Sequence, residues 1–140
     1  MGLDSYAART PVDFFDPDLD VDQVDESFGC TRRDLLAFWW AGKRRESAGG
    51  GLFVGNYFRG SIYALLIQHV SGVWIERTWI LPETVRKMWT AFDACDPEQT
   101  IRDYEASGGR KGEYHPSDVA DLRAFFRVCA KRGLGLVGSW

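Results

Sequence analysis

Residues 115–133, HPSDVADLRAFFRVCAKRG, decide most of the fold because they predict one long amphipathic helix that ends at Gly133. Apolar side chains recur three or four positions apart and share one face of this helix: Val119, Leu122, Phe125, Phe126 and Cys129. Acidic residues lie near its start and Lys131 and Arg132 near its end, where each charge favours the helix dipole. Such a helix must bury its apolar stripe, so we expect it to pack against other elements around one core.

Both ends of the sequence predict strands. Residues 1–8 alternate between two sides, with Leu3, Ser5 and Ala7 on one of them. Residues 134–140 carry repeated glycines, which allow another backbone to approach closely. Pairing the two strands in one sheet would anchor both ends of the chain.

Thr31 and Asp34 have the spacing of a helix cap, and the apolar residues that follow recur at helical spacing. We expect this helix to be short, because Gly42 and a basic run should end it ahead of a mobile loop at residues 43–51.

Ser61 is expected to cap a second helix over residues 62–70, with Ser71 and Gly72 as its end. This segment is apolar nearly all round, a pattern typical of a central, buried helix.

Three more elements are predicted between residues 73 and 112. Residues 73–81 are rich in β-branched and aromatic side chains, which favours a strand. Pro82 and Glu83 then begin a helix whose apolar face consists of Val85, Met88, Trp89 and Phe92. Asp96 begins a further helix, which the glycine-rich hinge at residues 107–112 ends.

Together these elements predict one domain over residues 1–140. A chain of 140 residues with 45% hydrophobic side chains is long enough for one core and too short for two. No linker composition divides it. We therefore expect an α+β fold, with several helices packed on a small, mainly antiparallel sheet.

The net charge of −3 hides an uneven distribution. An acidic, irregular segment covers residues 9–30, and residues 13–26 hold most of its carboxylates. The simplest interpretation is a solvated loop; the alternative is an acidic surface that mimics nucleic acid or docks on a basic partner.

The three cysteines, Cys30, Cys95 and Cys129, have no close-spaced partners, which fits neither a disulfide framework nor a zinc site. No apolar run approaches the length of a membrane span, and the amino terminus lacks the pattern of a secretion signal. We expect a cytoplasmic protein with no cofactor, no metal ligands and no membrane contact.

A glycine-rich segment, residues 49–61 with the sequence GGGLFVGNYFRGS, offers a candidate anion site. Gly55 and Gly60 have part of the spacing of a nucleotide phosphate loop, but the lysine of that loop is missing, which argues against nucleotide hydrolysis. The amides at the start of the following helix could still hold a phosphate or carboxylate. The residues expected to bind it are Asn56, Tyr57, Arg59, Gly60 and Ser61. Alternatively, this is a structural turn whose arginine pairs with a carboxylate such as Asp4 or Glu76.

Two residues outside this segment could contribute to the same site. His115 follows the glycine hinge and could lie over a pocket, whereas His69 falls within an apolar helix and is expected to pack. Trp74 and Trp79 have opposite parity on their predicted strand, so one of them should face a surface or pocket; we take Trp79. A pI near 5.4 argues against direct nucleic-acid binding.

Several blocks of the chain resemble an uncharacterised family of small proteins from actinobacteria and their phages. These are the opening MGLDSYA, Phe58-Arg59-Gly60 with Tyr63, residues 79–85 (WILPETV), and residues 125–137 (FFRVCAKRGLGLV), in a chain that ends RGLGLVGSW. The resemblance implies a bacterial or phage origin and a cytoplasmic setting. It implies no activity, cofactor or catalytic residue.

Two functions remain open on the sequence. The first is a non-enzymatic accessory protein that sequesters a small anionic ligand or docks on a host protein. The second is a small transferase or hydrolase that uses His115 as acid or base and Arg59 as an anion clamp. The sequence leaves the ligand, the partner and the oligomeric state open.

Overall fold

A computed structural model of the chain describes residues 4–9, 30–46 and 53–138. Its elements in chain order are β1 (Asp4–Ala8), α2 (Arg32–Glu46), β2 (Phe53–Val54), β3 (Tyr57–Arg59), α3 (Gly60–Ser71), β4 (Trp79–Ile80), α4 (Pro82–Asp93), α5 (Pro97–Ala106), α6 (Pro116–Arg132) and β5 (Gly135–Gly138). Nearly all of the predicted acidic segment, and residues 47–51 of the predicted loop, lie outside the described residues.

The strands form one five-stranded sheet in the order β2-β3-β1-β5-β4, and every neighbouring pair is antiparallel. Strands β1 and β5 pair in the middle of the sheet, with Ser5 opposite Gly138 and Tyr6 opposite Val137. The predicted α+β fold and the pairing of the two terminal strands are therefore confirmed.

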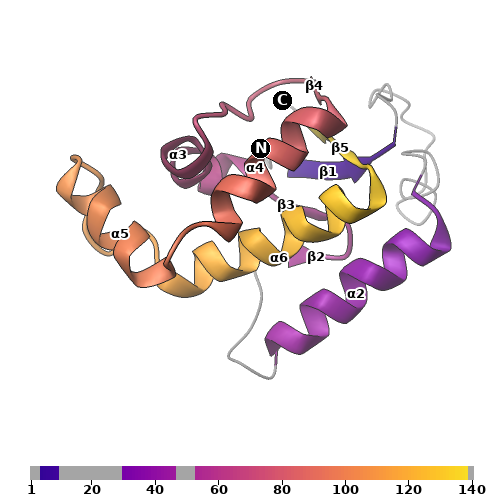
Figure 1. The fold of residues 1–140 in the computed structure, drawn as a ribbon, viewed down its shortest axis with the longest axis horizontal. Helices are drawn as coiled ribbons and strands as arrows, with labels where there is room; N and C mark the ends of the chain where they lie inside the picture. Colours follow the sequence, from indigo (N-terminus) through magenta and orange to yellow (C-terminus); the bar gives the residue numbers. More distant parts are fainter. Residues whose placement is uncertain (1–3, 10–29, 47–52, 139–140) are drawn as a thin grey trace.

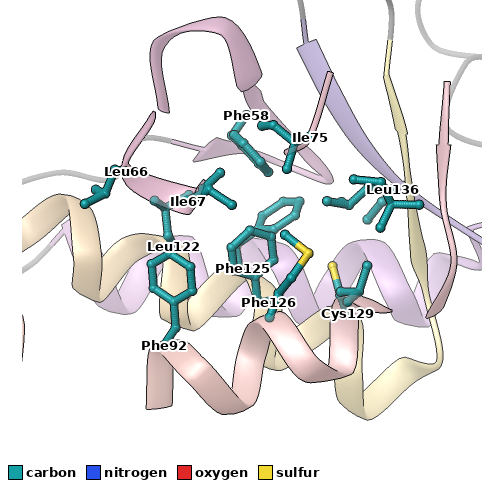
Figure 2. Packing of buried hydrophobic residues seen from close by; sticks show 14 of the residues in the cluster. Phe58, Leu66, Ile67, Ile75, Phe92, Leu122, Phe125, Phe126, Cys129 and Leu136 are labelled. Atoms are coloured by element: carbon teal, nitrogen blue, oxygen red, sulfur yellow. The ribbon is translucent and has the colours of Figure 1, made fainter. Parts of the chain in front are cut away.

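Helices α2, α4 and α5 pack against α6, which lies between α4 and α2 in front of the sheet (Figure 1). The apolar stripe of α6 is buried as predicted, and it meets the inner side of the sheet at Phe58. Aromatic rings fill the centre of this layer, with ring centroids 5.0 Å apart between Phe58 and Phe125 and 5.2 Å between Phe92 and Phe126 (Figure 2). One continuous core therefore lies between the helices and the sheet.

Helix α2 begins as predicted and ends later than predicted. The backbone amide of Thr31 donates to Oδ2 of Asp34 at 2.8 Å, and the amide of Asp34 donates to the Thr31 hydroxyl at 3.2 Å, which is a capping box. The helix continues through Gly42 to Glu46, so the expectation of a loop from residue 43 is wrong for residues 43–46. A glycine inside a helix costs only about 1 kcal/mol, and the packing of α2 on α6 offsets that cost.

Helix α3 differs from its prediction in two respects. It begins at Gly60 with Arg59 at the cap position, so Ser61 lies inside the first turn and is not the cap. Its outer face is not buried: Ile62 is 51% exposed and Leu65 47%. Because α3 packs on α4 and α5 from one side only, the opposite apolar side chains remain at the surface. Gly72 ends the helix as predicted, in the left-handed conformation at φ 73°.

The strand predicted over residues 73–81 is reduced to Trp79 and Ile80. Only these two residues pair with β5, opposite Val137 and Leu136. The carbonyl of Thr78 still accepts from the amide of Gly138 at 3.2 Å, but residues 73–77 lie outside the ladder. The apolar ones pack into the core, so their β-branched and aromatic composition reflects burial and not strand pairing.

Helices α4, α5 and α6 all begin and end close to the predicted residues. Asp96 caps α5 by accepting a hydrogen bond from the amide of Gln99, and Gly133 ends α6 at φ 67°. Within the described part of the chain, no helix combines the length and the apolar character needed to cross a bilayer.

Candidate functional site

The residues expected to bind an anion surround the β2–β3 turn and the start of α3. Asn56 is buried, and its side-chain amide donates to the carbonyl of Ala7 at 3.2 Å. The backbone carbonyl of Asn56 accepts from the backbone amide of Ala7 at 2.8 Å. Asn56 therefore holds the turn against β1, and its amide group points into the protein.

Tyr57 and Trp79 lie on the same face of the sheet, in one row across four strands. Tyr57 is opposite Tyr6, Tyr6 is opposite Val137, and Val137 is opposite Trp79. The rings of Tyr57 and Tyr6 are 5.1 Å apart, and Trp79 lies over the backbone of Gly135. Both predicted aromatic residues thus take part in packing on the sheet face that is turned away from the helical core.

Arg59, Gly60 and Ser61 begin α3, and the first turn of this helix carries no acidic residue. Arg59 is exposed and lies directly opposite Asp4 in the β1–β3 pair. Among the described residues, Arg59 forms no ion pair, so neither Asp4 nor Glu76 is its partner. Its role as a ligand residue stays a prediction.

His115 occupies the cap position of α6, and its backbone amide donates to Oδ2 of Asp118 at 2.8 Å. The preceding residue, Tyr114, donates its hydroxyl to the carbonyl of Ile62 at 2.6 Å, which places the start of α6 near the start of α3. Burial and then the charges of Asp118 and Asp121 raise the pKa of Tyr63 in the same region. The charges of Asp118 and Asp121 disfavour the binding of an anionic ligand there. The joint action of His115 and Arg59 stays a prediction.

A different surface has the shape of a binding site: the outer face of α6. Arg123, Arg127 and Lys131 are spaced four residues apart, so they form one row along this helix. We call these three residues the basic row. Grooves lie on either side of it, one toward α4 and one toward α2.

The α4–α6 groove has a volume of about 500 Å³. Its lining consists of Trp89, Asp93, Ala120, Arg123, Ala124, Arg127 and Lys131. The lining includes all three cations of the basic row and one carboxylate, that of Asp93. The side chains that line the groove therefore have a net charge of +2. Trp89 forms part of the wall, and its indole N–H is buried without an acceptor among the described residues.

The α2–α6 groove has a volume of about 610 Å³ and a different character. Its lining consists of Ala37, Trp40, Ala41, Ala124, Arg127, Val128, Lys131 and Arg132. Five of these eight residues are apolar, and none is acidic. Arg127 and Lys131 are therefore shared by both grooves, and the two grooves differ in what surrounds these cations.

The cations of this surface differ in their partners. Arg123 is half-buried, and its Nη1 donates to the backbone carbonyl of Cys95 at 3.4 Å. Arg132 is paired, because its Nε donates to Oδ1 of the buried Asp34 at 2.6 Å. Arg127 and Lys131 have no ion-pair partner in the part of the chain that the structure describes, and both are exposed. Two free positive charges therefore stand at the border of the two grooves.

The spacing of Arg123, Arg127 and Lys131 was visible in the sequence and could have indicated this row. The grooves beside it could not, since they depend on which helices flank α6. In the described residues, no group of three or more His, Cys, Asp or Glu side chains is arranged to hold a metal ion. No protein-family model, curated protein or solved structure matches this chain. What it binds must be inferred from its own residues.

Proposed function

We propose that this chain is a non-enzymatic binding protein that holds a small anionic ligand on the basic row, within the α4–α6 groove. The observation that supports it is the concentration of three cations around one carboxylate in a concave site. Guanidinium groups bind phosphate and carboxylate oxygens through two parallel hydrogen bonds, so Arg123 and Arg127 suit an oxyanion.

The size and the wall of the groove narrow the ligand class. A volume of about 500 Å³ is within the range of small-ligand sites and accommodates a nucleotide-sized molecule. Trp89 adds an aromatic ring beside the cations. A phosphate monoester with an aromatic portion fits these features, because its dianion matches the excess of two positive charges.

The sequence favoured the start of α3 for the same function. Arg59 and Ser61 are exposed there, but neither groove described above includes them. A groove lets several cations contact one ligand at the same time, so we assign the ligand to the basic row.

Calorimetric titration at low ionic strength tests this assignment, with orthophosphate and a nucleoside monophosphate as the probes. We expect saturable binding that weakens about tenfold or more in Arg123→Gln and Arg127→Gln, because a hydrogen bond to a charged group contributes roughly 1.5–3 kcal/mol. Arg86→Gln is the matched control, since Arg86 is an exposed arginine of α4 that lines neither groove.

Two results would contradict the proposal. One is the absence of saturable binding for both probes. The other is binding that Arg59→Ala abolishes and Arg127→Gln leaves intact, which would move the ligand to the start of α3.

We further propose, from the family resemblance, a bacterial or phage accessory role in the cytoplasm, with the ligand drawn from the anions of a bacterial cell. Direct nucleic-acid binding is not expected, because the net charge of −3 opposes accumulation along a phosphate backbone.

A further inference from the structure

The α2–α6 groove owes its shape to small side chains. Ala37 and Ala41 of α2 face Ala124 of α6, and each of the three ends at its Cβ atom. Larger side chains, Trp40 and Val128, stand beside them and form the walls. The result is an apolar channel between two packed helices that no described side chain fills.

Several large apolar side chains of α2 are exposed, and one of them, Trp40, lines this channel. Leu36 is 44% exposed, Trp39 48% and Trp40 57%. The two indole rings lie 4.9 Å apart in an edge-to-face arrangement, which limits their freedom. Contiguous exposed aromatic side chains next to a groove are typical of protein interaction sites, and tryptophan is enriched among the residues that carry binding energy.

Charge determines the kind of partner. Arg127 and Lys131 border the apolar floor, and no carboxylate lines the groove. The carboxylate of Asp34, on the first turn of α2, is buried and already pairs with Arg132 and Arg9. A partner that buries apolar side chains here therefore gains by bringing carboxylates to Arg127 and Lys131.

We infer that the α2–α6 groove is a docking site for an acidic amphipathic helix of a partner protein. Apolar side chains three and four positions apart would enter between Trp40 and Val128, and glutamate or aspartate side chains would face Arg127 and Lys131. A nucleic acid fits less well, because the apolar floor offers its phosphates no donors and the chain is net acidic.

This docking site does not depend on the small-anion site. The two share Arg127 and Lys131, but Trp40 and Ala37 line only the α2–α6 groove, and Arg123 and Trp89 line only the other. Variants of these unshared residues therefore separate the failure of one proposal from the failure of the other.

The test is a display selection from a library of helical peptides with randomised surfaces, performed on the full chain. Ala37→Glu, which fills and charges the groove, serves for counter-selection. We expect the recovered peptides to be rich in Glu and Asp and to carry apolar residues at helical spacing. Recovery of basic peptides, of peptides without that spacing, of peptides that bind Ala37→Glu equally well, or of none at all would overturn the inference.

The affinities of protein variants for the best recovered peptide then show where on the protein the peptide binds. We expect Trp40→Ala to weaken binding roughly thirtyfold, as for a central interface tryptophan, and Arg123→Gln to leave it within about twofold. Leu65→Ala is the matched control, because Leu65 is an exposed apolar residue on α3, away from both grooves. Circular dichroism confirms that each variant is folded.

Two further outcomes decide against the site. Equal losses in Trp40→Ala and Leu65→Ala would mean nonspecific hydrophobic association. A single-stranded oligonucleotide that binds more tightly than the peptide at physiological salt would assign the surface to nucleic acid.

Discussion

Arg132 donates its Nε to Oδ1 of Asp34 at 2.6 Å, a bond between residues 98 positions apart in the sequence. Arg9 donates to both carboxylate oxygens of the same residue, at 3.0 and 2.9 Å. The side chain of Asp34 is 0% exposed, so one buried carboxylate joins the end of β1, the first turn of α2 and the last turn of α6. The position of α2 along α6, and with it the α2–α6 groove, depends on this junction.

Asp34→Asn should destabilise the protein by roughly 2–4 kcal/mol, because it removes one charge and leaves two guanidinium groups without their partner. Both arginines are partly exposed, which keeps the cost below that of a fully buried pair. Urea unfolding followed by circular dichroism measures it. Asp103→Asn, on the exposed face of α5, provides the comparison and should change stability little. A loss below about 1 kcal/mol in Asp34→Asn would show that the junction is dispensable.

Acid should weaken the same junction. Burial would raise the pKa of Asp34, but hydrogen bonds from the Thr31 amide, Arg132, the Thr31 hydroxyl and Arg9 outweigh burial and lower the pKa below 3.8. A carboxyl whose pKa is lowered on folding stabilises the protein above its unfolded value and loses that contribution as the pH falls through the folded value. The difference in unfolding free energy between the wild type and Asp34→Asn should therefore be constant near neutral pH and shrink below about pH 4. A difference that stays constant into that acid range would contradict this assignment.

Gly135→Ala should destabilise the sheet. A Cβ at this position of β5 would collide with the carbonyl oxygen of Ile80 and with the ring of Trp79. The carbonyl belongs to the paired backbone of β4 and cannot move freely, so we expect a loss of about 1–3 kcal/mol. Thermal unfolding measures it. Gly72→Ala is a useful comparison, since that site has open space and carries only the strain of φ +73°. A neutral Gly135→Ala would mean that the close approach is not required.

The shared cations predict competition between the two ligand classes. Orthophosphate should weaken the binding of an acidic helical peptide, because Arg127 and Lys131 line both grooves. Arg127→Ala should weaken both ligands about tenfold, whereas Arg123→Ala should affect only phosphate and Ala37→Glu only the peptide. Fluorescence anisotropy of a labelled peptide, titrated with phosphate at constant ionic strength, gives the result. Additive binding of the two ligands would disprove the shared role.

Two tyrosines should resist ionisation in alkali. Burial, and then the hydrogen bond to Glu113 and its charge, raise the pKa of Tyr104 to about 12. Burial and the charge of Glu113 also raise the pKa of Tyr114. A tyrosine whose pKa is raised on folding stabilises the protein below pH 10 and loses that contribution as the pH rises toward the folded value.

Phenolate absorbance tests this assignment. Near pH 10, where an ordinary tyrosine is half ionised, Tyr104 and Tyr114 should stay protonated in the folded protein and contribute almost nothing to the phenolate absorbance. Tyr104→Phe should accordingly lower only the last part of the titration curve. A smaller amplitude near pH 10 in that variant would refute the assignment.

The sequence was sufficient for the elements whose signals are local. The stripe of α6, the proline starts of α4 and α5, and the Thr31–Asp34 capping box each depend on residues a few positions apart, and all three are present in the structure. The pairing of β1 with β5 could also be predicted from the sequence. Residues 1–8 alternate between two sides and residues 134–140 are rich in glycine, and few other segments could pair with them.

The predictions were wrong where contacts between residues far apart in the sequence determine the secondary structure. Residues 73–77 have a strand composition, but the pairing with β5 covers only Trp79 and Ile80, with one further backbone bond to Thr78. Gly42 resembles a helix end, but α2 continues because it packs on α6. The grooves were out of reach for the same reason: that Trp40 lies beside Arg127 is a consequence of the α2–α6 packing, which the Asp34–Arg132 bond helps to fix.

The central position of β1 and β5 in the sheet has a consequence for synthesis on the ribosome. Of the elements described here, β1 is synthesised first and β5 last. Strand β3 pairs with the outer edge of β1, and β4 pairs with the outer edge of β5. A nascent chain that lacks Gly135–Gly138 thus has no complete sheet on which to close its apolar helices. Stalled or truncated translation products should expose that apolar surface, which makes them targets for chaperones and proteases until the last strand emerges.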